Sequence, residues 1–355
     1  MGNRTRGFKW SLSAVLVVAP TLMGQPGGGG RPSFEQPPSN AKPGPAGERV
    51  PVPKEVRGTL VDLRPRWEQG EVIRYVMTLR SHNRIVEAKA DAVAKPAPKA
   101  KLRPGQPAAV EDPAITQTLT QEITFTLRPI KVEPEAGATV DMVYERVKIH
   151  MITGEDELEF DSSKPAKGDE DNPLRMLTDG MVGAKQSIRF ERDGQITSVS
   201  GGGQPGIEQA LRKLGGGAGI GGGGGAGAGD LFGMIRSSGT GATLVKVGDN
   251  WTHRDELSAG AFGALSMVTN YMLRSAGSGR ATVQMNGKLE SKSADGPTSP
   301  VKIGPTRLMG EYIWDTARGQ LLSLENEQEV QISMGGPDGT RMNSKQTMRV
   351  ERQGR

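Results

Sequence analysis

Three glycines, Gly217, Gly219 and Gly222, match the spacing G-x-G-x-x-G, with which dinucleotide-binding proteins bring backbone amides close to a pyrophosphate. Such a loop follows a strand and opens a helix, because the helix N-terminus must face the phosphates. Here the preceding stretch, 205–214, has helical periodicity, and eleven of the fifteen residues in 215–229 are glycine, so the match arises by chance. We therefore predict that 215–229 is a flexible connector rather than a phosphate site.

Other residues that could do chemistry form no recognisable site. The chain has no cysteine, which excludes disulfides, Cys-ligated zinc, iron–sulfur clusters and a thiol nucleophile. The three histidines, His82, His150 and His253, lie far apart, and Lys185 follows alanine rather than glycine, so "GMVGAKQS" is not a P-loop. The acidic runs lack the ligand spacing of an EF-hand. We predict no catalytic residue, no cofactor and no metal; a hydrolase with a carboxylate pair brought together only by folding stays an alternative.

The first 24 residues have the pattern of a secretory signal peptide. Arg4, Arg6 and Lys9 precede an apolar run of about ten residues that ends in small residues, and cleavage is expected after Gly24. The run is too short to span a bilayer comfortably, and no second one follows. We expect an exported protein, periplasmic or extracellular, with no lipid anchor and no membrane span after cleavage.

Charge gives no reason to expect a nucleic-acid partner. The formal net charge is +5, and three of those positive charges lie in the leader, which leaves +2 for the rest of the chain.

Two further segments resemble disordered linkers. Residues 25–56 contain eight prolines and six glycines, and residues 88–113 are rich in alanine, lysine and proline. A β-rich domain is predicted over 57–352, with the insert 88–113 and the glycine tract inside it. Two related halves, divided near 215–240, are an alternative.

The remaining sequence alternates between apolar and polar residues with a period of two, which predicts long strands with one buried face. In 140–151 the apolar positions change phase, which predicts a bulge near Glu145. The apolar positions that carry the alternation are Ile73, Tyr75, Met77 and Leu79; Ile115, Leu119, Ile123, Phe125 and Leu127; Leu265, Met267, Tyr271 and Leu273; Tyr312 and Trp314; Leu322, Leu324, Val330, Ile332 and Met334; and Met342, Met348 and Val350.

Turn and helix signals connect these strands. Asp193-Gly194 predicts a tight hairpin, and 315–319 a longer turn. Short helices are predicted at 205–214, at 230–238 and within 172–180. The predicted fold is mainly β: a large, curved antiparallel sheet, a half-barrel or open barrel, with two or three short helices and long disordered insertions.

Aromatic residues mark the surface on which we expect an apolar ligand. A curved sheet can leave part of its apolar face unfilled, with helices as a cover. The candidate ligand-face residues are Phe125, Tyr144, Tyr271, Phe232, Trp251 and Trp314. Ordinary packing in the core and at strand edges is the alternative role of these residues.

Four stretches together resemble a family of secreted, β-rich bacterial proteins of unknown function found in planctomycete-type genomes. They are "WEQGEVIRYVM" (67–77), "IRFERDGQITSVSG" (188–201), "VKVGDNWTHRDEL" (245–257) and "GEYIWDTARGQLLSL" (310–324). The resemblance implies a β-rich fold and no catalytic residues. The long strands are also similar, at the level of fold, to periplasmic lipoprotein carriers with a half-barrel.

These observations give three hypotheses of function. The first is a non-catalytic envelope protein that binds an apolar or lipid-like ligand on the concave sheet face. The second is a structural or protein-interaction module of the envelope that pairs with a partner protein, for example through an edge strand. The third is the hydrolase with an unrecognised carboxylate site.

Overall fold

The computed structural model describes residues 58, 60–86, 114–164, 172–178, 181–194, 196–200, 244–258, 264–291, 301–334 and 340–354. The predicted leader, the linker, the insert 88–113, the glycine tract and the helices predicted at 205–214 and 230–238 lie outside these residues. The predictions for those segments therefore stay predictions.

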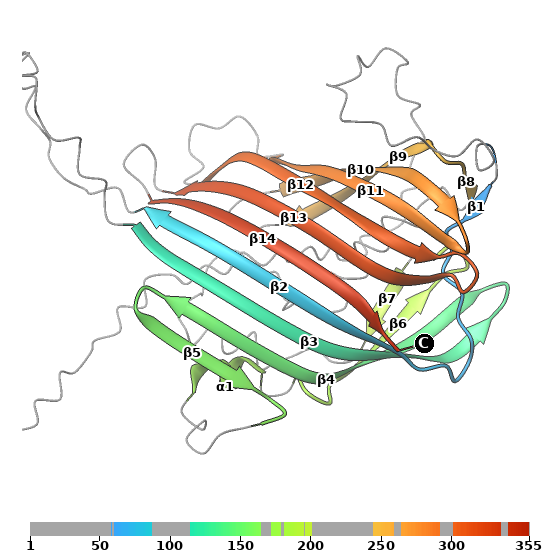
Figure 1. Cartoon of the computed structure of the whole chain (residues 1–355), viewed down its shortest axis with the longest axis horizontal. Helices are drawn as coiled ribbons and strands as arrows, with labels where there is room; N and C mark the ends of the chain where they lie inside the picture. The colour runs from blue at the N-terminus through green and yellow to red at the C-terminus, as the bar shows by residue number, and fades with distance from the viewer. Residues whose placement is uncertain are drawn as a thin grey trace, which may run out of the picture.

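The described chain is mainly β and forms one large antiparallel sheet of twelve strands that does not close into a barrel (Figure 1). The strand order is β7-β6-β4-β3-β2-β14-β13-β12-β11-β10-β9, and β5 pairs with the second half of β4. A separate two-stranded sheet joins β1 to β8. The strands are β1 (Val61–Asp62), β2 (Ile73–Val86), β3 (Ala114–Glu133), β4 (Gly137–Thr153), β5 (Asp156–Asp161), β6 (Lys185–Phe190), β7 (Ile196–Ser200), β8 (Leu244–Val245), β9 (Asn250–Ser258), β10 (Ala264–Gly277), β11 (Arg280–Ser291), β12 (Val301–Asp315), β13 (Gln320–Met334) and β14 (Thr340–Gln353).

Strands from before and after the glycine tract belong to the same sheet. The last strand, β14, pairs with β2 from Arg341↔Val86 to Gln353↔Arg74. The two parts of the sequence are therefore joined through continuous backbone hydrogen bonding at the centre of the sheet.

The predicted alternation and its interruption are both confirmed. Apolar side chains from Ile73 to Leu79 in β2 are buried at every second position. In β4, Arg146 faces Thr124 and Tyr144 faces Phe125, so Glu145 is the extra residue of a bulge. Two members of the predicted apolar set differ: Ile115, near the start of β3, is 45% exposed, and Leu322 is half-buried, because a register irregularity in β13 buries its neighbour Leu321 instead.

The predicted turns and the helix in 172–180 are also present. The chain reverses between β6 and β7 at Gly194, and between β12 and β13 the Asp315 carboxylate accepts the backbone N–H groups of Ala317 and Arg318. Helix α1 (Pro173–Thr178) begins after Asn172, whose side-chain oxygen accepts the N–H of Leu174.

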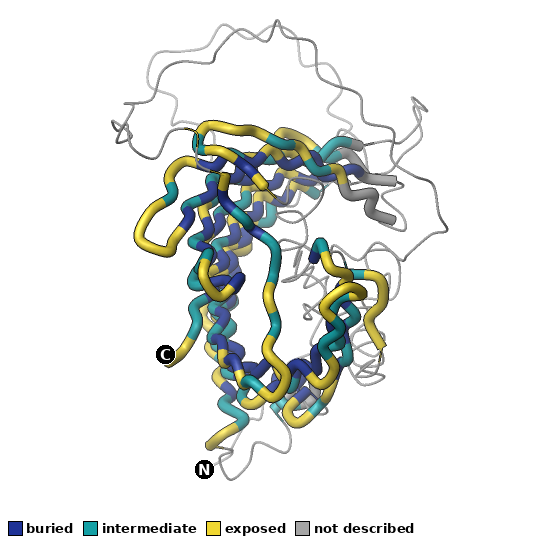
Figure 2. Tube along the Cα trace, turned by 90° about the vertical axis from the view of Figure 1, so that its right-hand side faces the viewer, coloured by how far each residue is buried: buried dark blue, intermediate teal, exposed yellow. Residues whose placement is uncertain are grey.

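The segment between β1 and β2, residues 63–72, crosses one end of the sheet and is called the strap here. The Arg66 N–H donates to the Gly319 carbonyl at the β12–β13 turn (3.0 Å), while the neighbouring Trp67 ring lies 5.0 Å from the ring of Phe190 in β6. Strands β6 and β13 are five strand spacings apart, about 24 Å along the sheet. Consecutive residues reach both only because the sheet curls, and the curl is visible in Figure 2, where the strap crosses the end facing the viewer.

Two glycines let hairpin turns approach the strap. A Cβ on Gly319 would lie 2.6 Å from the Arg64 carbonyl and the Arg66 nitrogen, and a Cβ on Gly194 would lie 2.6 Å from the Pro65 ring. Both glycines also have positive φ, +60° and +88°. The strap is therefore held between turns from opposite sides of the curved sheet.

In the described part of the chain, no helix has the length and apolar character needed to cross a membrane.

Candidate binding face

The side chains that point into the curve of the sheet form the inner face, defined by the register of Tyr75 and Phe125. Both belong to the main buried cluster, which also contains Leu63 of the strap. The strand register identifies the inner-face residues of every strand from β7 to β10 in the order of the sheet. Among these described residues one side chain is charged, that of Arg352. The guanidinium of Arg352 lies 3.7 Å from the Glu71 carboxylate at the strapped end. Everywhere else the inner face of these strands is apolar or neutral.

Two of the predicted ligand-face residues meet at the strapped end. Phe125 and Tyr144 are cross-strand partners, and both are almost fully buried. The Phe125 ring stacks on Tyr75 at 5.6 Å, and the Tyr75 hydroxyl donates to the Leu321 carbonyl at 3.0 Å. Burial raises the pKa of Tyr75, so its hydroxyl stays protonated. These rings fill the space between the strands and the strap.

The other candidates lie on the far side of the sheet. Trp251 in β9 is partly buried and stacks on Tyr271 in β10, with ring centroids 5.7 Å apart. Trp314 is buried near the end of β12. Among the described residues, neither indole N–H of Trp251 and Trp314 has an acceptor. Phe232 lies outside the described residues.

Sequence reasoning missed a polar band in the middle of the inner face. The band consists of Gln117 (β3), Ser81 and Asn83 (β2), and Ser344 and Gln346 (β14), each 5% exposed or less. The Asn83 side-chain amide donates to the side-chain oxygen of Gln117 (3.3 Å) and accepts from the Ser344 hydroxyl (2.7 Å). The signal was present in "LRSHNRIV", where serine and asparagine take the positions that leucine and isoleucine hold on either side.

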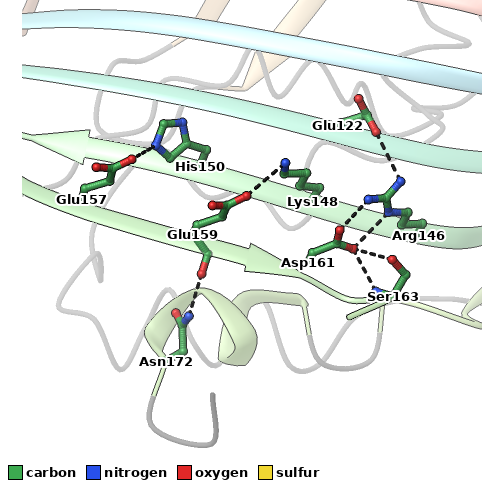
Figure 3. Close-up of polar contacts among 9 residues, drawn as sticks. All are labelled: Glu122, Arg146, Lys148, His150, Glu157, Glu159, Asp161, Ser163 and Asn172. Carbon is green, nitrogen blue, oxygen red and sulfur yellow. Dashed lines mark hydrogen bonds and ion pairs between the residues drawn. The ribbon is translucent and has the colours of Figure 1, made fainter. Parts of the chain in front are cut away.

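The outer face of β4 and β5 has the opposite character, because basic side chains of β4 contact acidic side chains of β5 diagonally across the strand pair (Figure 3). His150 Nε2 lies 2.7 Å from Glu157, and Lys148 Nζ lies 3.0 Å from Glu159. The Glu159 carboxylate raises the pKa of Lys148. Because these side chains are largely solvated, the pairs contribute little each and mainly keep this face in water.

Next to these pairs, Arg146 of β4 forms a bidentate ion pair with Asp161 of β5. Its Nε and Nη2 donate to the two carboxylate oxygens, and Ser163 adds two further hydrogen bonds. The Arg146 guanidinium holds the pKa of Asp161 well below its usual range. This arrangement ties the end of β5 to β4.

A pocket of about 470 Å³ lies beside the strap and contains three arginines. Each of them already has an acidic partner: Arg64 binds Asp62, Arg189 binds Glu133 and Arg192 binds Glu135. The cationic charge is therefore neutralised before an anion arrives. The pocket is lined by Arg64, Glu135, Ala136, Arg189, Glu191, Arg192, Asp193 and Thr197.

Described carboxyl groups with a shifted pKa are all shifted downward. Hydrogen bonds from Lys131 and Lys288 lower the pKa of Glu133 and Glu290, respectively. A general acid of a hydrolase needs the opposite shift. The described residues thus offer no observation in favour of the hydrolase hypothesis.

The histidines do not come together either. His82 is exposed on the outer face, with Nδ1 3.2 Å from the Thr118 hydroxyl, and His150 contacts Glu157. Within the described ranges, no three His, Asp or Glu side chains are grouped as a metal site would require.

Comparison with known proteins matches one part of the chain. The model of a family of unknown function (DUF6263) matches residues 135–215, which contain β4, β5, α1, β6 and β7. No curated protein matches the sequence. The matched segment covers one side of the curved sheet, including the outer charged pairs and one wall of the inner face.

Proposed function

We propose that this chain is an exported binding protein that takes up an apolar or lipid-like ligand on the inner face of its curved sheet. One observation carries the proposal: from β7 to β10 the inner face has a single charged side chain among the described residues, and that residue lies at the strapped end. A large uncharged surface of this kind is favourable for apolar contact and unfavourable for contact with bulk water.

The architecture supports the same proposal. Among the described strands, β7 and β5 lie at one edge of the sheet and β9 at the other, so the described residues bound the interior with a single layer of strands and a strap at one end. The likeness to half-barrel lipoprotein carriers is a fold-level analogy that agrees with this shape. Export follows from the leader-like residues 1–24 and belongs to the proposal.

The test is native mass spectrometry of the protein purified from the envelope fraction, followed by extraction and identification of bound lipid. We expect a mass increment in the range of one lipid-like molecule. Leu79→Gln, which places an amide at a 5%-exposed inner position, should reduce the occupied fraction several-fold. The control Thr78→Gln changes the adjacent side chain, which points to the outer face, and should leave occupancy unchanged.

A second candidate function is pairing with another envelope protein through β7. Four of the five residues in this edge strand are exposed, and Ile196–Ser200 contains no charged residue and no proline. Edge strands without such protection readily add a further strand. Recovery of a monodisperse complex with another protein, and no extractable ligand, would favour this function over the first.

A further inference from the structure

The polar band crosses the centre of the inner face, which on the strands from β7 to β10 has one charged side chain among the described residues. It extends over three adjacent strands, because Gln117 pairs with Asn83, Asn83 with Ser344, and Ser81 with Gln346. Apolar side chains border it along the strands: Leu79 and Met348 toward the strapped end and Met342 toward the other end, all buried. The band is therefore a stripe of neutral hydrogen-bonding groups that continues to Gln328 of β13, the partner of Gln346, with apolar side chains beside it on β2 and β14.

One pair within the band is left unsatisfied. Ser81 and Gln346 face each other across β2 and β14 and are 2% and 5% exposed. Neither the Ser81 hydroxyl nor the Gln346 amide nitrogen has a hydrogen-bond partner among the residues that the structure describes. Leaving such groups buried without partners is energetically unfavourable, so natural structures usually supply a partner.

The chemistry of the two groups limits what that partner can be. The Gln346 amide nitrogen donates only, whereas the Ser81 hydroxyl both donates and accepts. Directly opposed residues have Cβ atoms about 4.5–5.5 Å apart, so one small head with two oxygens can reach both groups. An ionised head is disfavoured, because burying a charge without a counter-ion is far more costly than burying a neutral polar group.

From this geometry we propose that the band binds the uncharged head of an amphiphile that carries hydroxyl, ester or amide groups, such as a monoacylglycerol. Its hydrocarbon chain lies on the neighbouring apolar side chains. This inference rests on the proposed function and specifies the head group of its ligand. Phospholipids and fatty acids, whose heads are ionised, bind less well.

The experiment is competition with the fluorescent probe N-phenyl-1-naphthylamine on the full chain after removal of bound lipid. The competitors are 1-oleoylglycerol, oleate and 1-octadecene, which share an apolar chain and differ in the head. We expect 1-oleoylglycerol to bind about tenfold more tightly than either of the others. The double variant Ser81→Ala/Gln346→Met, which makes both orphan positions apolar, should lower 1-oleoylglycerol affinity about tenfold and leave 1-octadecene affinity unchanged.

The matched control is Arg80→Ala/Thr347→Ala, the neighbouring cross-strand pair on the outer face, which should change neither affinity. If 1-octadecene displaces the probe but 1-oleoylglycerol is no better, or is unaffected by the inner double variant, the head-group inference is overturned and the proposed function stands. If the probe and all three competitors fail to bind the wild-type chain, both are overturned. If the variant does not fold, the wild-type chain still tests the head-group inference: tighter binding of 1-oleoylglycerol than of oleate supports it, and equal or weaker binding overturns it.

Discussion

The inner face has two levels along the same strands, the strapped end and the polar band, and the side chains at the two levels differ in type. At the strapped end, β2 contributes Tyr75, which stacks on Phe125 and bonds to Leu321 across the curve. Six residues further along the same side of β2, about 20 Å away, Ser81 is equally buried but has no hydrogen-bond partner among the described residues. The first level packs aromatic rings beneath the strap, and the indole N–H groups of Trp67 and Trp314 there have no acceptor among the described residues. The second level is a row of neutral polar side chains, in which Ser81 and Gln346 face each other without partners.

The difference shows where stability and binding are separated. The strap and the aromatic rings close one end of the sheet and hold its curvature. Because the packing of the rings and the strap stabilises the fold, the band can contain unpartnered polar side chains that lower the stability. Predicted ligand-face residues such as Phe125 and Tyr144 lie in the closed end, while the candidate head-group site lies in a level that aromatic content did not mark.

The largest expected loss of stability is from a substitution at the closed, strapped end of the sheet. Phe125→Ala removes a fully buried ring between Tyr75 and Tyr144 and should lower the free energy of unfolding by about 3–5 kcal/mol. Urea denaturation followed by circular dichroism measures it. Thr116→Ala, at an exposed outer position in the same strand, is the control and should cost less than about 0.5 kcal/mol. A small effect of Phe125→Ala would mean that the strapped end is not the stabilising core.

The second largest loss of stability is expected where the strap contacts the β12–β13 turn. Gly319→Ala places a Cβ against the strap backbone at 2.6 Å and should destabilise by about 2–3 kcal/mol, with faster hydrogen exchange at the Arg66 amide. Gly279→Ala is a matched control, since Gly279 also has positive φ (+76°) but has open space at the Cβ position. It should cost only about 1 kcal/mol. Equal costs in the two variants would show that the contact with the strap is unimportant.

A smaller effect is expected from the carboxylate that orders the start of the strap. Asp62 accepts hydrogen bonds from the Arg64 backbone and guanidinium and from Arg66. Burial alone would raise the pKa of Asp62, but these hydrogen bonds outweigh it and lower the pKa to about 2. Asp62→Asn should therefore cost about 1 kcal/mol at pH 7, a modest amount because solvent screens the pair.

The pH dependence of that cost follows from the sign of the shift. A carboxyl group with a lowered folded pKa adds stability above its ordinary pKa near 3.8, and the contribution is lost as the pH falls through about 2. The difference in unfolding free energy between wild type and Asp62→Asn should thus be constant above about pH 5 and shrink toward pH 2. A difference that grows on acidification would contradict this account.

The smallest expected effect is in the band. Ser81→Ala removes a buried hydroxyl that has no partner among the described residues, so lipid-free protein should be unchanged or stabilised by up to about 1 kcal/mol. Thermal unfolding of the delipidated variant against wild type measures it. A loss of more than 1 kcal/mol would show that the hydroxyl already has a structural role, and the contrast between the two levels would fail.

Much of this architecture could be read from local sequence. Side chains in a strand alternate between faces, so the apolar positions from Ile73 to Leu79 predicted both the strand and its buried side. The phase change around Glu145 predicted the bulge, because one inserted residue reverses every later side chain. The Asp193-Gly194 signal predicted the hairpin between β6 and β7 for an equally local reason.

The candidate site needed information that local patterns do not contain. The polar positions Ser81 and Gln346 are 265 residues apart and become neighbours only because the last strand pairs with β2. Alternation identified them as inner-face positions in principle, but it could not show that they meet or that their partners are missing.

The sequence by itself determined that the chain forms long half-buried strands, where they turn, and that cysteine chemistry is excluded, because these properties depend on residue type and spacing along one segment. Only the tertiary structure decided which strands are neighbours, that the strap closes one end, and that an unsatisfied serine and glutamine lie opposite each other. The physical reason is that strand order and curvature arise from hydrogen bonds and packing between residues far apart in the chain, and no single segment encodes them.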